Sequence, residues 1–469
     1  MKNLEKFLSL LDGEVDGLLL TSRYSRHYGA EFDIAEGMAI VTKKGCRYFT
    51  DSRYIESAQA NIKGFEVLDV NSGRNYAKCL NEAIADFGVT ALGYEENYLT
   101  VAEFMGLEKN LNAKLVPFNA KINGFRDVKE DWELDLLRKA QKIADKAFKD
   151  TLPRIHAGMT ELEAQAELIY EMYKNGAQGL SFDPIVVSGP NTSMPHGVAG
   201  ERVIQEGDFI TMDFGVLYQG YCSDTTRTFA VGYATEEMKK VYNVVLQAQL
   251  AGIAVTKAGV TGAEVDGAAR KVISDAGYGD YFGHSYGHGV GLEIHEGPNM
   301  SFRNEKPIPA GAVTSAEPGI YLPGKFGVRI EDVTIVTENG CEDITNIPKG
   351  TQSLVLVCVD PDAPDPEAPK LTFVHWVAYN LPAQQLSIPE GADLESLFPG
   401  SCEGVNGRGT VGYIGPKPPI GTHRYFFKVF AVDTVLSFNE PPELKDVFNA
   451  IDGRVVQMAE TMGTYKLQF

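Results

Sequence analysis

The sequence predicts three domains: an α/β domain, an α+β domain built from two related halves, and a mostly-β module at the C-terminal end. Three observations indicate this fold class. Short apolar runs alternate with helical stretches near the N-terminus, an internal repeat fills the middle, and the composition changes near residue 349. A chain of 469 residues has ample length for two to four domains, each with its own core.

Each domain has its own local pattern. Residues 1–125 mix short apolar runs such as "GMAIVT" with helical stretches, as α/β domains do. From Trp132 to Phe148 apolar residues recur with helical spacing, so a long helix is expected to open the second domain, residues 126–348. Residues 349–469 contain the strand-like "SLVLVCV", a loop rich in Pro and Asp, and turns rich in Gly and Pro, which predict the mostly-β module.

The second domain contains an internal repeat. "AGMTELEAQAELIYEMYKNGA" begins at Ala157 and "AGVTGAEVDGAARKVISDAGY" at Ala258, and each places a Thr-x-x-Glu capping box ahead of an amphipathic helix. Downstream, "IQEGDFITMDFG" from Ile204 aligns with "IPAGAVTSAEPG" from Ile308. A period of about 100 residues is too long for a solenoid, so a duplication with pseudo-twofold packing fits better.

Four acids occupy matching places in the two halves. The repeat aligns Asp213 with Glu317 and Asp224 with Glu331. Asp213 and Asp224 are symmetric about the centre of "LYQG", and Glu317 and Glu331 about the glycine of "LPGKF", so each pair is predicted to face across a hairpin. Gly220 leaves room for the first turn to shift by a residue, so the register of that hairpin is approximate. Like charges placed in this way are destabilising. Two divalent cations compensate four carboxylates best, and they lower the pKa of a bridging water.

Histidines add to this cluster. Of the eight in the chain, His196 lies in "MPHG", and His284, His288 and His295 lie in "GHSYGHGVGLEIHEGP". Three histidines within twelve residues, among glycines that permit close backbone approach, favour a site. One would ligate a metal, and the others would donate protons to a tetrahedral intermediate. The alternative is that each acid is a solvated strand residue, but the apolar residues flanking "TMDFG" and "TSAEPG" indicate burial.

The composition excludes several classes. A formal net charge of −20 argues against nucleic-acid binding, which needs clustered Lys and Arg. The six cysteines are scattered without a CxxC pair, so neither a disulfide framework nor a zinc knuckle is indicated. Acidic residues interrupt the apolar positions at the N-terminus, and no apolar run approaches the ~20 residues that span a bilayer. We therefore expect a cytoplasmic protein without membrane insertion.

The motifs resemble those of a known family. The order Asp213, Asp224, His288, Glu317, Glu331, with "SDTTRT", "EPGIY" and "VRIED", resembles the five-ligand dinuclear site of the pita-bread-fold metallopeptidases over about residues 1–348. "FTDSRYIESA" resembles the extra domain of their Xaa-Pro branch, aminopeptidase P and prolidase. The resemblance implies a creatinase-like N-terminal α/β domain followed by a pita-bread catalytic domain with pseudo-twofold halves.

The resemblance also implies a reaction. Two divalent ions, Mn²⁺ before Co²⁺ or Zn²⁺, would hold a bridging hydroxide that attacks an Xaa-Pro bond at the N-terminus of a peptide. It implies catalytic roles for His196, His295 and Glu317, and substrate contacts for His284 and Arg329. The expected partners are peptides with proline at the second position and a second copy of the chain in a homodimer. An Xaa-Pro dipeptidase is the alternative.

The tail resembles a second family. "CVDPDAP", "FVHWVAYNLPA" and "GYIGPKPPIGTHRYFFKVFAVD" are similar to the phosphatidylethanolamine-binding proteins. The resemblance implies a small anion pocket lined by Asp360, His375, Gly415, His423 and Tyr425, although these residues would also serve to brace loops. The family's N-terminal strands are missing, so the module is predicted to be truncated.

The two resemblances meet at "NIPKG". A natural fusion, a recombined gene and an engineered chimera all fit such a join. A different function also fits the tail, namely a non-catalytic binding protein that uses the anion pocket and keeps the preceding domains as a scaffold.

Overall fold

The computed structural model describes residues 2–467 apart from 12, 72, 74, 346–350, 383–387 and 390. The chain divides into two compact units, Met1–Thr345 and Asn346–Phe469. The join at "NIPKG" and the predicted boundary after residue 348 lie outside the described residues. No helix within the described part of the chain is both long enough and apolar enough to cross a bilayer.

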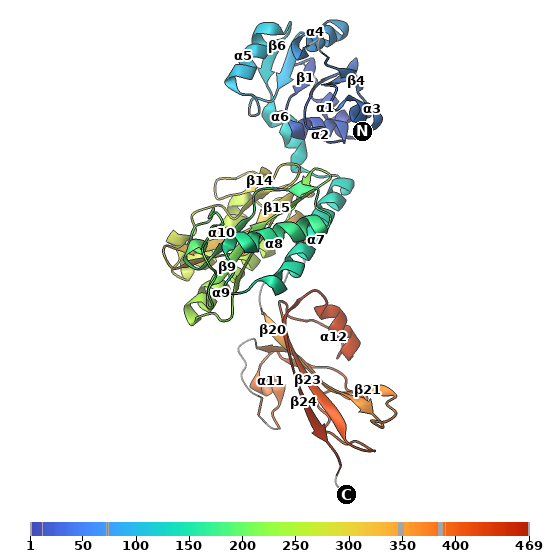
Figure 1. Ribbon diagram of the computed structural model, residues 1–469, viewed down its shortest axis with the longest axis vertical. Helices are drawn as coiled ribbons and strands as arrows, with labels where there is room; N and C mark the ends of the chain where they lie inside the picture. Colours follow the sequence, from blue (N-terminus) through green and yellow to red (C-terminus); the bar gives the residue numbers. More distant parts are fainter. Residues whose placement is uncertain are drawn as a thin grey trace. The chain divides into compact units, whose positions relative to one another are not determined.

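The N-terminal domain is a six-stranded sheet in the order β4-β3-β2-β1-β5-β6, with helices on both faces (Figure 1). Its strands are β1 Gly17–Leu20, β2 Met38–Thr42, β3 Gly45–Thr50, β4 Glu66–Asp69, β5 Ala91–Tyr94 and β6 Lys114–Pro117. Its helices are α1 Lys2–Ser9, α2 Arg23–Ala30, α3 Ile55–Asn61, α4 Tyr76–Phe87, α5 Val101–Asn110 and α6 Asn119–Asn123.

The central strands β1 and β2 of this sheet are largely apolar because both faces are buried there. Leu18 and Leu20 of β1 join the core formed with α1 and α2, whereas Leu19 between them joins the core formed with α4 and α5. The first of these cores continues into the next domain through Tyr221 and Val290. The N-terminal domain therefore packs against the domain that carries the acids.

The helices of the second domain repeat as predicted. A 3₁₀ turn, η1 (Gly124–Asp127), leads into the long helix expected from the apolar spacing. Thr160 and Thr261 cap α8 and α10, each in a capping box with a glutamate three residues on. The helices are α7 Asp131–Thr151, α8 Glu161–Lys174, α9 Glu236–Val255 and α10 Gly262–Asp275, with 3₁₀ turns η2 Leu152–Arg154, η3 Gly189–Ser193 and η4 Gly279–Tyr281.

Each half also contributes its own strands. In the first half, sheets β12-β9-β8 and β11-β10-β7 contain β7 Gly179–Leu180, β8 Ile185–Ser188, β9 Phe209–Phe214, β10 Val216–Tyr218, β11 Tyr221–Cys222 and β12 Thr225–Ala230. In the second half, sheets β14-β13-β15-β18-β19 and β16-β17 contain β13 Gly287–Gly289, β14 Glu296–Met300, β15 Val313–Ala316, β16 Gly319–Leu322, β17 Phe326–Arg329, β18 Asp332–Val336 and β19 Cys341–Asp343.

The hairpin of the second half has the predicted register. Gly319 pairs with Arg329, and Ala316 with Asp332. Both pairs are symmetric about Gly324, which has a positive φ of 72°. Glu317 and Glu331 therefore lie opposite each other between the two ladders.

The hairpin of the first half differs from the prediction by two residues. Asp213 pairs with Thr226 rather than with Asp224. The reason is the turn: Gln219 and Gly220 have φ values of 48° and 83° and form a two-residue turn centred one residue further along than expected. Because side chains alternate with a period of two, Asp224 still falls on the same face as Thr226, diagonal to Asp213.

The two halves meet along β12 and the segment before β18. The backbone N–H of Glu331 donates to the carbonyl of Thr226 at 3.0 Å. Arg227 donates to Asp332 at 2.7 Å, and both side chains are almost fully buried. These contacts bring the acid-bearing ends of the two hairpins together.

The C-terminal module is an antiparallel sheet in the order β22-β21-β20-β23-β24. Val355 and Val357 pack with the second helix of the module, whereas Leu354 and Leu356 pack with Leu394 of the first. The elements are β20 Ser353–Ala363, β21 Leu371–Pro382, α11 Leu394–Leu397, β22 Cys402–Glu403, β23 His423–Val432, α12 Leu444–Ile451 and β24 Val455–Tyr465. The predicted fold class is confirmed for all three parts.

Candidate active site

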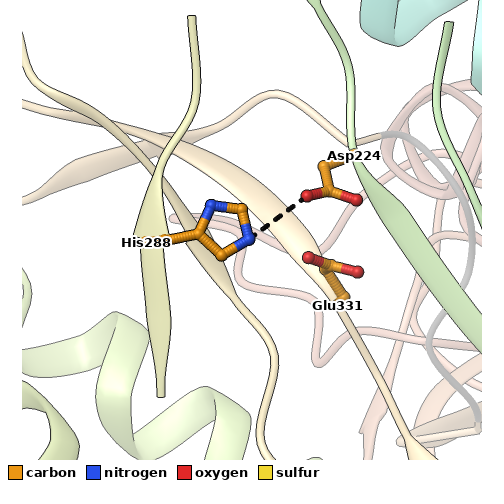
Figure 2. A group of neighbouring side chains, drawn as sticks. All are labelled: Asp224, His288 and Glu331. Carbon is orange, nitrogen blue, oxygen red and sulfur yellow. Dashed lines mark ion pairs between the residues drawn. The ribbon is translucent and has the colours of Figure 1, made fainter. Parts of the chain in front are cut away.

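The predicted acids converge with a histidine at the meeting point of the halves. Asp224, His288 and Glu331 each offer one ligand atom, and these atoms lie within 4.8 Å of one another. Figure 2 shows the His288 ring pointing toward both carboxylates, which come from separate segments. His288 Nε2 lies 3.5 Å from Asp224 Oδ2 and 3.2 Å from Glu317 Oε1. The cluster therefore combines residues from both repeats.

Asp213 joins the cluster beside a buried arginine. Arg329 donates from Nη2 to Asp213 Oδ2 at 2.6 Å and from Nε to Thr226 Oγ1 at 2.9 Å. Thr226 in turn donates to Glu331 at 2.7 Å. The other carboxylate oxygen of Asp213, Oδ1, is buried without a hydrogen-bond partner. Arg329 and Thr226 thus fix two acids and leave one acceptor oxygen unused.

Burial opposes ionisation of the cluster. It raises the pKa of Asp224 well above the ordinary value, and the charge of Asp213 adds to the increase. Burial and then the charge of Asp224 raise the pKa of Glu331 in the same way. Burial also raises the pKa of Asp213, although Arg329 opposes this increase. Carboxylates held so close together need more positive charge than one arginine supplies.

His288 and Glu317 form a close pair within the cluster. Burial by itself would lower the pKa of His288, but the hydrogen bond and charge of Glu317 raise it to about 9. Burial would raise the pKa of Glu317, but His288 outweighs it and lowers that pKa to about 2. Ser315 Oγ donates to Glu317 Oε1 at 3.0 Å.

The donor set fits divalent metal ions. It offers carboxylate oxygens and one imidazole nitrogen, which suit manganese, cobalt or zinc. Burial and the charges of neighbouring carboxylates raise the pKa values of Asp224 and Glu331, and Asp213 Oδ1 lacks a hydrogen-bond partner. Both features are expected of residues that bind cations through their free oxygens.

The cluster opens into a cavity of about 360 Å³. The remaining predicted residues line it: His196, His284, His295 and Arg329. The His295 ring packs 4.2 Å from the ring of His288, centroid to centroid. Burial and the neighbouring His288 lower the pKa of His295. The structure therefore brings together all nine residues predicted for the catalytic domain.

Several contributors were missed from the sequence. Tyr321 Oη accepts a hydrogen bond from Arg329 Nη1 at 3.0 Å and lies 2.8 Å from His284 Nε2. Phe182 and Ile185 add an apolar wall to the cavity. Tyr321 lies within "EPGIY", a motif in which only the glutamate suggests chemistry, whereas Phe182 and Ile185 carry no local signal that distinguishes them from core residues.

The five residues predicted in the tail also share one cavity, of about 310 Å³. His423 Nδ1 lies 2.7 Å from Asp360 Oδ2, and the rings of His375 and Tyr425 lie 5.1 Å apart. The hydroxyl of Tyr425 is buried without a hydrogen-bond partner. Lys370, Arg408 and Lys417 line the same cavity.

Family models match nearly the whole chain. The creatinase/prolidase N-terminal domain matches residues 4–128, and metallopeptidase family M24 matches residues 135–338. The phosphatidylethanolamine-binding protein family matches residues 314–466, so it overlaps the M24 match over residues 314–338. In the structure these overlapping residues form strands of the catalytic domain.

Known proteins resemble about three quarters of the chain. It is 41% identical over 336 residues to the uncharacterized peptidase YqhT of Bacillus subtilis, covering 71% of this chain and 95% of the relative. A solved Xaa-Pro dipeptidase from Bacillus anthracis is 43% identical, with a TM-score of 0.72, and covers 74% of this chain and 98% of its own. An X-Pro aminopeptidase structure from Thermotoga maritima is 37% identical, with a TM-score of 0.70 and the same coverage.

Fold, cluster and relatives together define the class of protein, which is a metallopeptidase. The chain belongs to metallopeptidase family M24 and also carries a creatinase/prolidase N-terminal domain.

Proposed function

We propose that the chain hydrolyses the Xaa-Pro bond at the N-terminus of peptides and holds two divalent ions for this reaction. The observation that carries the proposal is the meeting of four carboxylates and one imidazole from both halves at the floor of a cavity. The solved relatives named Xaa-Pro dipeptidase and X-Pro aminopeptidase support the same substrate class. The proposed ligands are Asp213, Asp224, His288, Glu317 and Glu331.

When bound, the ions would supply Lewis acidity and a water of lowered pKa; manganese is the proposed metal. Side chains of the protein perform the proton transfer and the stabilisation of charge. A carboxylate oxygen of Glu317, which Ser315 orients, accepts the proton of the attacking water. His196 and His295, both exposed at the cavity, donate hydrogen bonds to the oxygen that gains negative charge in the tetrahedral intermediate.

The cavity wall fits proline at the second position. Phe182, Ile185 and Ile294 present apolar surface that suits a pyrrolidine ring. The carboxylates attract the free ammonium group at the N-terminus of the peptide, which would place the bond before proline over the cluster. Arg329 holds Asp213 in place for this contact.

Room beyond the cluster favours aminopeptidase activity over strict dipeptidase activity. A second cavity of about 460 Å³ shares His295 with the first, so residues after the proline have space to continue. The dipeptidase alternative is favoured by the similarity to the Bacillus anthracis relative, which is an Xaa-Pro dipeptidase by name. The homodimer and the cytoplasmic location stay predictions.

The proposal is tested with purified protein stripped by a chelator and reloaded with Mn²⁺. We expect two metal ions per chain by elemental analysis, and release of the N-terminal residue from an Xaa-Pro-Xaa tripeptide faster than cleavage of an Xaa-Pro dipeptide. Cleavage of the dipeptide alone would establish the dipeptidase alternative. Absence of both metal and cleavage would reject the proposal.

The tail supports a second function, binding of a small phosphorylated anion. The observation that favours it is the single cavity that gathers His375, His423 and Tyr425 with three basic side chains. Titration calorimetry with inorganic phosphate tests it, and His375→Ala should remove the heat of binding. Binding that is unchanged in His375→Ala would place the anion elsewhere. A wholly non-catalytic protein is not favoured, since the chain belongs to a metallopeptidase family.

A further inference from the structure

The ring of His295 lacks a hydrogen bond within the described part of the chain, although the proposed reaction needs it in a fixed place. Its position therefore depends on the backbone that carries it. That backbone is the short segment 293–296, which enters β14. The contacts that hold this segment in place therefore also hold the ring of His295 in place.

Three ion pairs, two from Arg126 and one from Lys129, hold the segment on both sides of His295. Arg126 of η1 donates from Nη2 to Glu293 Oε1, and its Nε lies 3.6 Å from Glu296 Oε2. Lys129 Nζ donates to Glu296 Oε1 at 2.7 Å. The side chains of Arg126, Lys129 and Glu296 are 5%, 2% and 3% exposed, so solvent screens these pairs little.

Further hydrogen bonds link the two ends of the segment to each other and the segment to the N-terminal domain. The backbone N–H of Glu293 donates to the side chain of Glu296 at 3.2 Å, which closes a turn that contains the backbone of His295. Tyr98, from the loop after β5, donates its hydroxyl to Glu293. The side chain of Arg126 lies 5.7 Å from the ring of Tyr24 of α2, measured from Cζ to the centroid.

We propose that Arg126 is a positioning residue, which acts through Glu293 and Glu296 to hold the His295 ring against the ring of His288, a proposed metal ligand. The inference rests on the proposed function, because it assigns a task to His295 in that reaction. It gives the N-terminal domain and η1 a part in catalysis that involves no contact with the reacting atoms. Reactions that depend on orientation lose roughly a hundredfold in rate when a group moves by 1 Å.

The kinetic test is a double-mutant cycle of Arg126→Met with His295→Ala. With an Xaa-Pro dipeptide, which ends before the second cavity that Arg126 lines, we expect Arg126→Met in the wild-type background to lower kcat roughly ten- to hundredfold with KM nearly unchanged. In the His295→Ala background the same change should have an effect of less than about twofold. Arg126→Lys should recover part of the loss, because it keeps the charge. Equal losses in both backgrounds would overturn the proposal.

The control is Arg138→Met, which removes an ion pair between α7 and Glu342 of β19 in the same unit and touches nothing in segment 293–296. It should leave kcat unchanged in both backgrounds. Should Arg126→Met fail to fold, Tyr98→Phe removes a single hydroxyl from Glu293 and is expected to lower kcat in the same non-additive manner.

A second measurement is independent of activity. With ¹³C-labelled histidine in the metal-free protein, eight ring signals are expected, and the signal lost in His295→Ala identifies that ring. Arg126→Met should move this signal and that of His288, which packs against it, and leave the rest in place. An unmoved His295 signal would overturn the proposal, even if the wild-type protein proved inactive toward Xaa-Pro peptides, a result that would reject the proposed function alone.

Discussion

At the scale of single residues, this site is distinguished by buried carboxylates whose ionisation is unfavourable. Asp224 and Glu331 are 3% and 1% exposed, and each lies near other acids. A fold selected for stability alone would replace such groups with apolar ones of similar size. Their presence therefore indicates a ligand of opposite charge.

Replacement of Asp224 should separate its role in metal binding from its effect on folding stability. In Asp224→Asn the amide keeps the shape and removes a buried charge, so we expect the metal-free protein to be at least as stable as the wild type. Activity should fall at least roughly a thousandfold, because a proposed metal ligand is lost. Urea denaturation, metal analysis and peptide hydrolysis check these outcomes.

The matched control is Asp208→Asn, also in the first half, where Asp208 accepts from Arg202 at 2.6 Å. It should lose stability and keep activity, the reverse of the Asp224 result. Substantial turnover in Asp224→Asn would contradict a role for this side chain in holding metal.

His27 gives a pH-dependent contribution to stability. It is buried, its ring packs against Tyr221 at 6.0 Å, and burial lowers its pKa from 6.5 to about 4, with Asp33 and Arg23 exerting opposite smaller effects. Folding lowers the pKa of this histidine, so its contribution to stability is fully present only above the unfolded-state pKa of 6.5. As the pH falls from 6.5 toward 4, the unfolded state binds a proton that the folded state does not, and this stability is lost.

Between pH 7 and pH 5.5 this group should remove about 1 kcal/mol of unfolding free energy. His27→Gln should change the unfolding free energy at every pH. In urea denaturation, the fall in that free energy between pH 7 and pH 5.5 should be smaller in the variant by this amount. A direct check is a titration of the labelled ring, where His27 should stay neutral down to about pH 4. Equal slopes for variant and wild type would rule out this contribution.

At the scale of elements, glycines permit the close approach of the strands that carry the cluster. A Cβ on Gly287 of β13 would collide with the backbone of Ser315 on β15; β13 contains His288, and β15 ends directly before Glu317. Gly287→Ala should therefore push the two strands apart, lower stability by roughly 1–3 kcal/mol and weaken metal binding. Thermal unfolding and metal titration measure both effects.

Gly283→Ala is the paired control, because a Cβ at Gly283 meets no atom within 4 Å. It should change stability by no more than about 0.5 kcal/mol. Similar effects of the two substitutions would show that crowding between β13 and β15 is not what requires glycine at position 287.

The hairpins show how far the sequence predicts such elements. Symmetry about Gly324 located Glu317 opposite Glu331 correctly. The same reasoning misplaced the partner of Asp213 by two residues, because a positive φ at Gln219 is a property of the turn that residue types alone did not reveal. The side-chain period of two nevertheless kept the acids on one face, so the cluster could be predicted although one register could not.

The supporting residues mark the limit of sequence reasoning. Charged and titratable groups stand out because their burial needs compensation, which is how the acids and histidines were found. Burial of Tyr321 and Thr226 needs no compensating charge, and their contacts with Arg329 depend on how segments distant in the sequence pack. Arg126 was missed for the same reason, since Glu293 lies far from it in the chain.

At the scale of the whole molecule, two families share a single chain. The match to phosphatidylethanolamine-binding proteins begins at residue 314, yet residues up to Thr345 belong to the first unit, in which β15 pairs with β13 and β18. The peptidase strands therefore stand where the N-terminal strands of the tail's own family were expected. The five-stranded sheet of the tail forms its two apolar cores without them.

The peptidase unit should function without the tail. The Bacillus anthracis relative matches 98% of its own length to 74% of this chain, which is about the share of the chain that the first unit spans. That unit also forms a compact body of its own, Met1–Thr345. A chain ending at Thr345 should fold, bind two metal ions and hydrolyse the tripeptide with kcat/KM within about twofold of the full chain, since every proposed ligand and cavity residue is retained. Kinetics and metal analysis on both lengths make the comparison, and a loss of more than about tenfold in a folded, metal-loaded short chain would mean that the tail contributes to the peptidase reaction.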